Sequence, residues 1–230
     1  MRASDLQKAL RKEANPERAK LSARYFKTGK GEYGEGDVFL GLTVPQQRAI
    51  ARGFYDMSLA DIAMLLKSPV HEDRFTALVI LVEQSKRSSE NDKAKIARFY
   101  LKNARRINNW DLVDTSAPQI LGPVVTRAML VRLASSRNLW ERRIAILATF
   151  YGIARGEFTD ALAIAEWLLK DPHDLIHKAV GWMLREIGKR DRVVLERFLA
   201  EHASGMPRTM LRYAIERFTP AERKRYMTSA

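Results

Sequence analysis

The chain has 230 residues, with 40 lysines and arginines against 27 aspartates and glutamates, and it contains no cysteine. The lack of thiols excludes disulfide bonds, cysteine-ligated zinc, iron–sulfur clusters and thiol catalysis. The formal net charge of +13 favours a polyanionic partner, nucleic acid first of all, because basic side chains release counterions from phosphates.

The expected compartment is the cytoplasm, in the bacterial cytosol or nucleoid. The sequence shows no apolar core of a signal peptide, and no apolar run approaches the roughly 20 residues that span a bilayer. The basic side chains are spread along the chain rather than gathered in a tail, which disfavours a membrane surface as partner. A basic protein without a specific anion is the alternative to a nucleic-acid binder.

Apolar residues recur at helical spacing along nearly the whole chain, and no segment shows the alternation of a strand. The clearest helical stretches are 59–66, 75–82, 96–100, 144–151 and 176–187. Short breaks with proline or glycine separate the stretches, as at 67–69, 122–123, 170–172 and 205–207. The sequence therefore predicts an all-α protein.

A glycine-rich stretch at 29–37 interrupts the first part of the chain. It lacks both a preceding strand and the Gly-Lys-Ser/Thr ending of a phosphate-binding loop, so we expect a mobile loop. A helix is expected soon after it, because Thr43 can cap an amino terminus and Pro45 suits a first turn.

Five predicted helices share a polar or charged residue followed by small and apolar ones. These residues are Arg74, Asp114, Arg143, Lys178 and Arg208, at spacings of 40, 29, 35 and 30 residues. Such spacing is typical of helix-pair repeats of the HEAT or armadillo kind, which stack into a curved solenoid. We expect residues 1–230 to form one HEAT-like repeat domain with a basic concave groove, in which Asp114 is the acidic exception.

Trp110 and Asp114 stand one helical turn apart, near the start of a predicted helix. Residues at i and i+4 share a helix face. The local apolar stripe from Leu112 to Ile120 points elsewhere, so both side chains should flank the core. We interpret the pair as a candidate site.

Capping of the helix does not explain Asp114. Asn108 or Asn109 already suits the cap, and Asp111 suits the first turn. Asp114 lies one turn further in, which favours a functional carboxylate.

Arg143 borders an apolar stripe, so its stem can lie along that surface while its guanidinium faces the groove. Arg142 should point more directly outward, and a solvated surface charge is the alternative for either arginine. Trp140 and Trp167 fall on apolar stripes, and we expect both in the core.

Trp182 falls roughly 130° from the apolar stripe of its own helix, which runs from Ile176 to Ile187. Its neighbours at i−4 and i+3 are Lys178 and Arg185, so the indole stands among cations. Such an aromatic side chain can stack on a sugar, a base or a cationic ligand. Packing against the next repeat is the alternative.

The four histidines do not indicate a metal site. His173 and His177 are spaced i, i+4, but Pro172 places His173 at a helix start and the His-Glu-x-x-His pattern is absent. The sequence also lacks a serine–histidine pair with an obvious third member and a nucleotide-binding motif. We expect neither a metal nor another cofactor.

Four segments together make the chain resemble the AlkD family of DNA alkylation repair glycosylases over roughly residues 5–225. They are Phe39–Pro45, Asn109–Pro118, Trp140–Ala145 and Lys178–Glu186. The resemblance implies excision of positively charged alkylpurines, chiefly N3-methyladenine and N7-methylguanine, by cleavage of the N-glycosidic bond in duplex DNA during base excision repair. It also implies that the enzyme works without enclosing the base.

By matching motif, the resemblance implies that Asp114 is the catalytic carboxylate, that Trp110 and Trp182 flank the lesion deoxyribose, and that Arg143 contacts DNA. The basic residues expected to bind DNA are Arg143, Lys178, Arg185, Arg142 and Arg74. The chemistry is consistent with these roles, because a cationic purine leaves as a neutral base without a general acid. Asp114 and the indoles would stabilise the oxocarbenium-like sugar, and Asp114 would orient the water.

The alternative is a non-catalytic HEAT-repeat protein that binds distorted or branched DNA through the same basic face. The charge of +13 disfavours a protein–protein scaffold. We expect a monofunctional hydrolase, because no lysine beside Asp114 invites Schiff-base chemistry. A single groove needs no partner subunit, so we expect a monomer.

Overall fold

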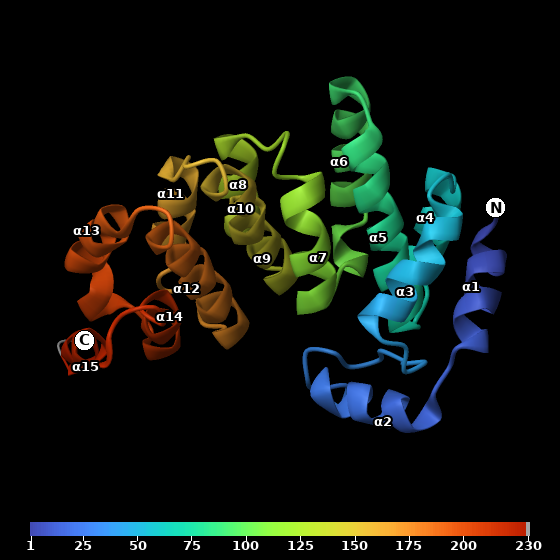
Figure 1. The fold of residues 1–230 in the computed structure, drawn as a ribbon, viewed down its shortest axis with the longest axis horizontal. Helices are drawn as coiled ribbons and strands as arrows, with labels where there is room; N and C mark the ends of the chain where they lie inside the picture. The colour runs from blue at the N-terminus through green and yellow to red at the C-terminus, as the bar shows by residue number, and fades with distance from the viewer. Residues whose placement is uncertain (229–230) are drawn as a thin grey trace. The chain divides into compact units, whose positions relative to one another are not determined.

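The computed structural model describes residues 1–228 and is helical throughout, with one isolated β-bridge between Val38 and Val70 in that range (Figure 1). The all-α prediction is therefore confirmed. The chain divides into two compact units, Met1–Val124 and Val125–Ala230. The single repeat domain stays a prediction. None of the described helices is both long and apolar enough to cross a membrane.

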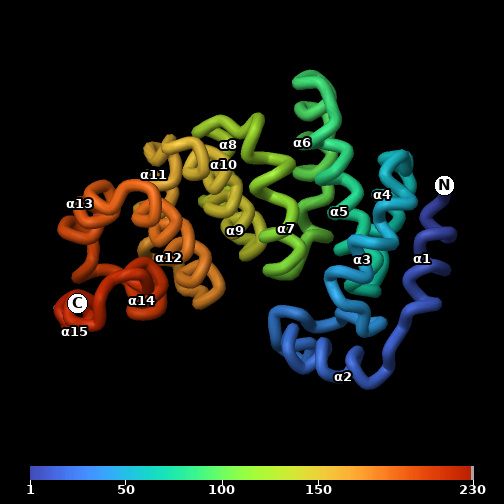
Figure 2. The backbone as a smooth tube through the Cα atoms, in the orientation of Figure 1, coloured from blue at the N-terminus to red at the C-terminus, as the bar shows by residue number. Residues whose placement is uncertain are grey.

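The first unit holds the helices up to α7 and two short 3-10 turns. They are α1 (Ala3–Lys12), α2 (Pro16–Tyr25), α3 (Val44–Ala51), η1 (Arg52–Phe54), α4 (Leu59–Leu66), α5 (His71–Arg87), α6 (Glu90–Lys102), η2 (Ala104–Arg106) and α7 (Trp110–Ile120). Within this unit, α5 packs against α3, α4 and α7. Figure 2 shows α2 running crosswise to α1 and α3.

The second unit holds α8 to α15. They are α8 (Arg127–Ala134), α9 (Leu139–Ala148), α10 (Phe150–Ile153), α11 (Thr159–Trp167), α12 (Asp174–Gly188), α13 (Arg192–His202), the 3-10 turn η3 (Ala203–Gly205), α14 (Arg208–Ala214) and α15 (Pro220–Thr228). Here α12 is the central helix, because it packs against α9, α13 and α14.

The helices follow the expected pairing. The second helices of the pairs are α5, α7, α9, α12 and α14, which begin at His71, Trp110, Leu139, Asp174 and Arg208. The residues that suggested the repeat all lie in the first five positions of these helices. This recurrence supports the helix-pair repeat that the sequence predicted.

Local signals explain the helix starts. Asn109 is the N-cap of α7, as predicted, and its side chain accepts a hydrogen bond at 2.8 Å from the N–H of Trp110, the first residue of the helix. Thr43 caps α3, with Pro45 in the first turn, as predicted. The glycine-rich stretch is a series of turns, in which Glu35 accepts a bond from the Gly31 N–H at 2.9 Å.

A buried carboxylate holds the segment that follows the glycine-rich stretch. Glu72, on α5, is 1% exposed and accepts hydrogen bonds from three consecutive main-chain N–H groups. The donors are Leu40 at 2.9 Å, Gly41 at 2.8 Å and Leu42 at 3.3 Å. Gly41 has a φ of +85°, and a Cβ there would lie 2.2 Å from the Asn15 carbonyl oxygen. Only glycine fits at this point.

The two predicted core tryptophans differ in their outcome. Trp140 is buried, with 7% exposure, so that prediction is confirmed. Trp167 is 56% exposed, so its prediction is wrong. The buried face of α11 is formed by Ala161, Ile164 and Ala165, and Trp167 projects about 110° from its centre.

Candidate functional site

Trp110 and Asp114 lie on α7 as the sequence predicted, outside its buried face. Leu112, Val113 and Ala117 are fully buried, whereas Trp110 and Asp114 are half-buried. Both side chains are therefore partly accessible at one edge of a helix whose other face is buried.

Tyr100, a buried residue whose pKa is affected by the charge of Asp114, carries no charge itself. The Tyr100 hydroxyl on α6 lies 2.9 Å from the Ser116 Oγ. Burial raises the pKa of Tyr100 above its ordinary value, the hydrogen bond with Ser116 lowers it, and the negative charge of Asp114 raises it again. Tyr100 thus remains a neutral phenol, and it adds no second negative charge near Asp114.

Trp110 belongs to an aromatic cluster, formed by Tyr25, Phe26, Phe39 and Trp110. Trp110 stacks on Phe26, with ring centroids 5.2 Å apart and planes inclined by 23°. Tyr25 meets Trp110 edge-on at 5.9 Å, and it is 66% exposed. The sequence analysis missed Tyr25 and Phe26, although two adjacent aromatic residues on a basic helix end are a visible signal.

A buried ionic network lies against this cluster and includes His71, Asp37, Asp111 and Arg74. The His71 Nδ1 lies 3.1 Å from the Asp37 Oδ2, and its Nε2 lies 2.8 Å from the Asp111 Oδ2. Arg74 pairs with the other oxygen of Asp37 at 2.6 Å. Arg74 was predicted to bind DNA, but its side chain is only 6% exposed, so a phosphate contact would require it to leave this pair.

The charges of this network follow from its geometry. Burial lowers the pKa of His71, but the charge of Asp111 and the hydrogen bonds to Asp111 and Asp37 outweigh it and raise the pKa to about 9. Burial raises the pKa of Asp37, but the hydrogen bonds from His71 and Arg74 outweigh burial, so the pKa falls below its ordinary value. At neutral pH, His71 is an imidazolium ion between two carboxylates.

Trp182 occupies a comparable position in the second unit. It lies on α12 outside the buried stripe that contains Ile176 and Ile187, as predicted, and it is half-buried. Its indole N–H donates to the Glu186 Oε1 at 3.3 Å, and the ring lies 6.3 Å from that of Phe150. The sequence analysis did not single out Glu186.

Glu186 collects several cations. It is 7% exposed and accepts bonds from Lys189 at 2.6 Å and from Arg190 at 3.2 Å. Burial raises the pKa of Glu186, but the bonds from Lys189 and Arg190 outweigh burial and lower it. Glu186 is therefore an ionised carboxylate, and its charge is offset by its neighbours.

The other predicted DNA-binding residues lie in the second unit and have acidic or main-chain partners. Arg143 is buried and donates to the Leu175 carbonyl, Arg142 pairs with Asp171, Lys178 with Asp174 at 2.7 Å, and Arg185 with Glu216. As expected, Arg142 is the more exposed of the two adjacent arginines. Lys178 and Arg185 are partly exposed and are the best placed of the four for phosphate contacts.

The paired histidines serve the local fold. The His173 Nδ1 accepts a bond from the Leu175 N–H at 3.1 Å, so His173 caps α12, and the His177 Nε2 lies 2.5 Å from the Asp171 carbonyl oxygen. Among residues 1–228, no group of three histidine or acidic side chains is placed to hold a metal ion.

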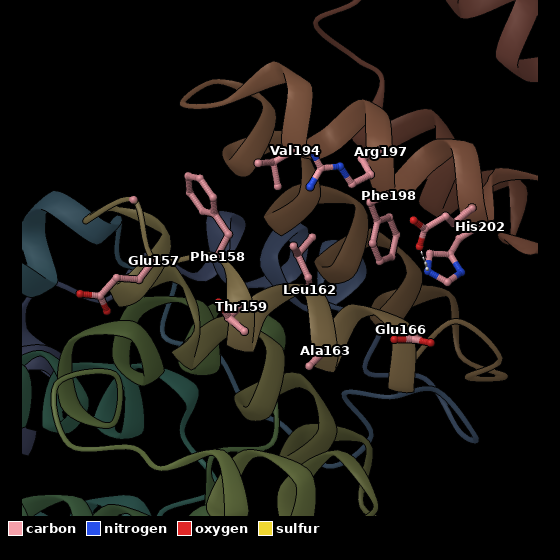
Figure 3. Close-up of a pocket in the computed structure, with 12 residues that line it drawn as sticks. Glu157, Phe158, Thr159, Leu162, Ala163, Glu166, Val194, Arg197, Phe198 and His202 are labelled. Atoms are coloured by element: carbon pink, nitrogen blue, oxygen red, sulfur yellow. Dashed lines mark ion pairs between the residues drawn. The ribbon is translucent and has the colours of Figure 1, made fainter.

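A pocket of about 570 Å³ lies between α11 and α13, and Figure 3 shows the side chains of these helices facing each other across it. Phe158, Leu162 and Phe198 form its apolar surface. Three glutamates, at 157, 166 and 201, line it together with Arg197 and His202, and none of the predicted site residues does.

The sequence matches the family model described as "DNA alkylation repair enzyme" over residues 6–218. A solved structure described as a predicted DNA alkylation repair enzyme from Enterococcus faecalis is similar, with a TM-score of 0.68 and 19% sequence identity. The match covers 90% of this chain and 97% of that chain. At such an identity, the structural match shows a shared fold. No curated protein matches the sequence.

Proposed function

Because the chain belongs to the DNA alkylation repair enzyme family, we propose that it is a DNA glycosylase for positively charged alkylpurines. The proposed reaction is hydrolysis of the N-glycosidic bond of N3-methyladenine or N7-methylguanine in duplex DNA. The family membership agrees with the motif resemblance, and it supports a role in DNA repair for the residues of the site.

One observation carries the proposal. A half-buried carboxylate, Asp114, and a half-buried indole, Trp110, stand one turn apart on α7, and Trp110 also packs against Tyr25 and Phe26. An anion and a π-face are the groups that stabilise a sugar cation.

The chemistry needs little beyond these two groups. An N3- or N7-alkylated purine is already cationic, so it leaves as a neutral base when the C1′–N bond breaks. The electron pair goes to the base, and C1′ becomes oxocarbenium-like. Asp114 stabilises this charge and orients the water that attacks C1′. Neutral lesions such as uracil gain nothing from this arrangement, and we expect weak or no activity on them.

The second unit supplies proposed DNA contacts. Trp182 offers an aromatic face for stacking, and Arg143, Lys178, Arg185 and Arg142 supply positive charge. The chain is proposed to act as a monomer on double-stranded DNA, without a metal or cofactor.

The decisive experiment measures free base released from duplex DNA that carries N7-methylguanine, with and without EDTA. The wild type is compared with Asp114→Asn, which keeps the size and removes the charge. Asp92→Asn is the matched control, because Asp92 lies exposed in the first turn of α6 and pairs with Lys95.

We expect release by the wild type and by Asp92→Asn, and none by Asp114→Asn, although this variant still binds the DNA. Release by Asp114→Asn at the wild-type rate would refute the catalytic role. Binding without release by the folded wild type would instead favour the non-catalytic DNA-binding protein.

A further inference from the structure

His71 is placed between two carboxylates that come from different parts of the first unit. Asp37 is the last residue of the glycine-rich stretch, and Asp111 lies in the first turn of α7. Both ring nitrogens are within hydrogen-bond distance of a carboxylate oxygen. Carboxylates only accept, so both nitrogens must donate, and the doubly protonated ring alone satisfies both contacts.

His71 is buried, so its ring nitrogens depend on these two carboxylates for their hydrogen bonds. The residue is 2% exposed, so water cannot replace a lost partner. The charged groups that face it are Asp37 from the loop, Asp111 from α7, and Arg74 from α5 itself, which is bound to Asp37. Loss of either partner would leave a buried polar group without a hydrogen bond, which is unfavourable.

Aromatic rings fix the plane of the imidazolium ring. Phe39 stacks on it at 4.6 Å, with the planes inclined by 21°. Phe26 lies 5.0 Å from it, with the planes inclined by 32°. A cation over an aromatic face is attracted by the ring quadrupole. His71 thus joins the ionic network to the aromatic cluster.

Two routes connect His71 to Trp110. The first runs through the hydrogen bond to Asp111, which directly follows Trp110 in the first turn of α7. The second is through packing, because Phe26 contacts both the His71 ring and the Trp110 ring. A change at His71 therefore reaches Trp110 through the main chain and through a ring.

We propose that His71 is a positioning residue for Trp110, holding the start of α7 through Asp111 and the indole plane through Phe26. The proposal rests on the proposed function for its effect on base release. His71 is buried, and it acts on the reaction only through these neighbours. The raised pKa of His71 agrees with the geometry, since it keeps the ring doubly protonated at neutral pH.

The first test compares His71→Gln with the wild type. Glutamine carries no charge, and both of its N–H donors lie on one nitrogen, so it cannot donate to the two carboxylates that the separate ring nitrogens of His71 reach. His202→Gln is the matched control, because His202 lies on α13 and contacts Phe198 and Glu201. We expect single-turnover base release to slow by roughly 10- to 100-fold in His71→Gln, because small misplacements of reacting groups have effects of that size. The Kd for DNA should change less than about twofold, as for a residue that does not touch DNA.

The second test uses the pH profile, and it keeps the proposal falsifiable if His71→Gln folds poorly. Wild-type release should fall as pH rises through about 9, where His71 loses its proton. Asp111→Asn keeps an acceptor but removes the charge that raises the pKa, so its alkaline limb should move to lower pH. An enzyme-free sample at each pH corrects for spontaneous base loss. An unmoved limb in Asp111→Asn would overturn the proposal.

The third test does not depend on activity. The chain has four tryptophans, and Trp110→Phe assigns the indole N–H signal of Trp110 in an NMR spectrum. This signal should shift with a midpoint near pH 9 in the wild type and show no such step in His71→Gln. An unchanged Trp110 signal in folded His71→Gln refutes the positioning role. If the wild type releases no base, the proposed function fails, and the indole signal still decides the role of His71.

Discussion

Gly181 lies on α12 in close contact with the backbone of α14, directly before Trp182. A Cβ at this position would lie 2.4 Å from the Met210 carbonyl oxygen and 2.5 Å from the Tyr213 Cβ. Both atoms belong to the backbone of α14 or are attached to it, so no rotamer change can relieve the overlap. Gly181→Ala must push α14 away from α12.

Two effects of opposite sign decide the outcome. Alanine improves helix propensity by about 1 kcal/mol relative to glycine. Overpacking in a core costs about 1–3 kcal/mol, and the upper end applies because the obstructing atoms are main-chain or Cβ atoms. We therefore expect Gly181→Ala to lower the free energy of unfolding by about 2 kcal/mol.

Urea unfolding, followed by far-ultraviolet circular dichroism, measures this change. Gly205→Ala is the matched control, because Gly205 lies in η3 of the same unit with nothing within 4 Å of an added Cβ. The control should be neutral or slightly stabilising, because alanine restricts the unfolded chain. A Gly181→Ala protein at least as stable as the wild type would refute the reasoning, since the gain in helix propensity would then offset the whole packing cost.

Two further predictions concern the first unit. The pKa of His71 rises from 6.5 to about 9 on folding, so the proton on His71 stabilises the fold fully below pH 6.5, and this stabilisation is lost as pH rises through 9. The difference is about 3 kcal/mol at most, and urea unfolding at pH 6.5 and 9.5 should show a drop in the wild type that His71→Gln lacks. Glu72→Gln should lower the free energy of unfolding by about 2 kcal/mol. Both carboxylate oxygens of Glu72 accept from the N–H groups at 40–42, whereas a glutamine amide has only one oxygen that can accept. Thermal unfolding checks this, and an unchanged Tm would mean that another acceptor serves those N–H groups.

The helices and their starts were predictable because they depend on neighbours a few residues apart. The spacing of apolar residues indicated α7 and α12, and Asn109 and Thr43 were recognisable as caps. The placement of Trp110 and Asp114 outside the buried stripe followed from the same helical geometry.

The ionic network around His71 was not predictable in this way. Its members, Asp37, His71 and Asp111, are 34 and 40 residues apart, and only the packing of α5 against α7 and the loop brings them together. The sequence also gave no sign that Arg74 would turn inward, because the sign of a charge does not reveal its partner. The exposed position of Trp167 shows the same limit, since a single residue at the end of a short helix has little periodicity around it.

The carboxylate of Glu72 is an anion that binds the main-chain N–H groups at 40–42 from within the protein. Successive N–H groups that converge on one point form a concavity of the kind that binds phosphate in other proteins. Here an internal side chain fills it, held by three hydrogen bonds and shielded from water. A phosphate of DNA would have to displace a covalently tethered competitor, whose effective concentration no solute matches. These main-chain N–H groups are therefore not open to an anion from outside the chain.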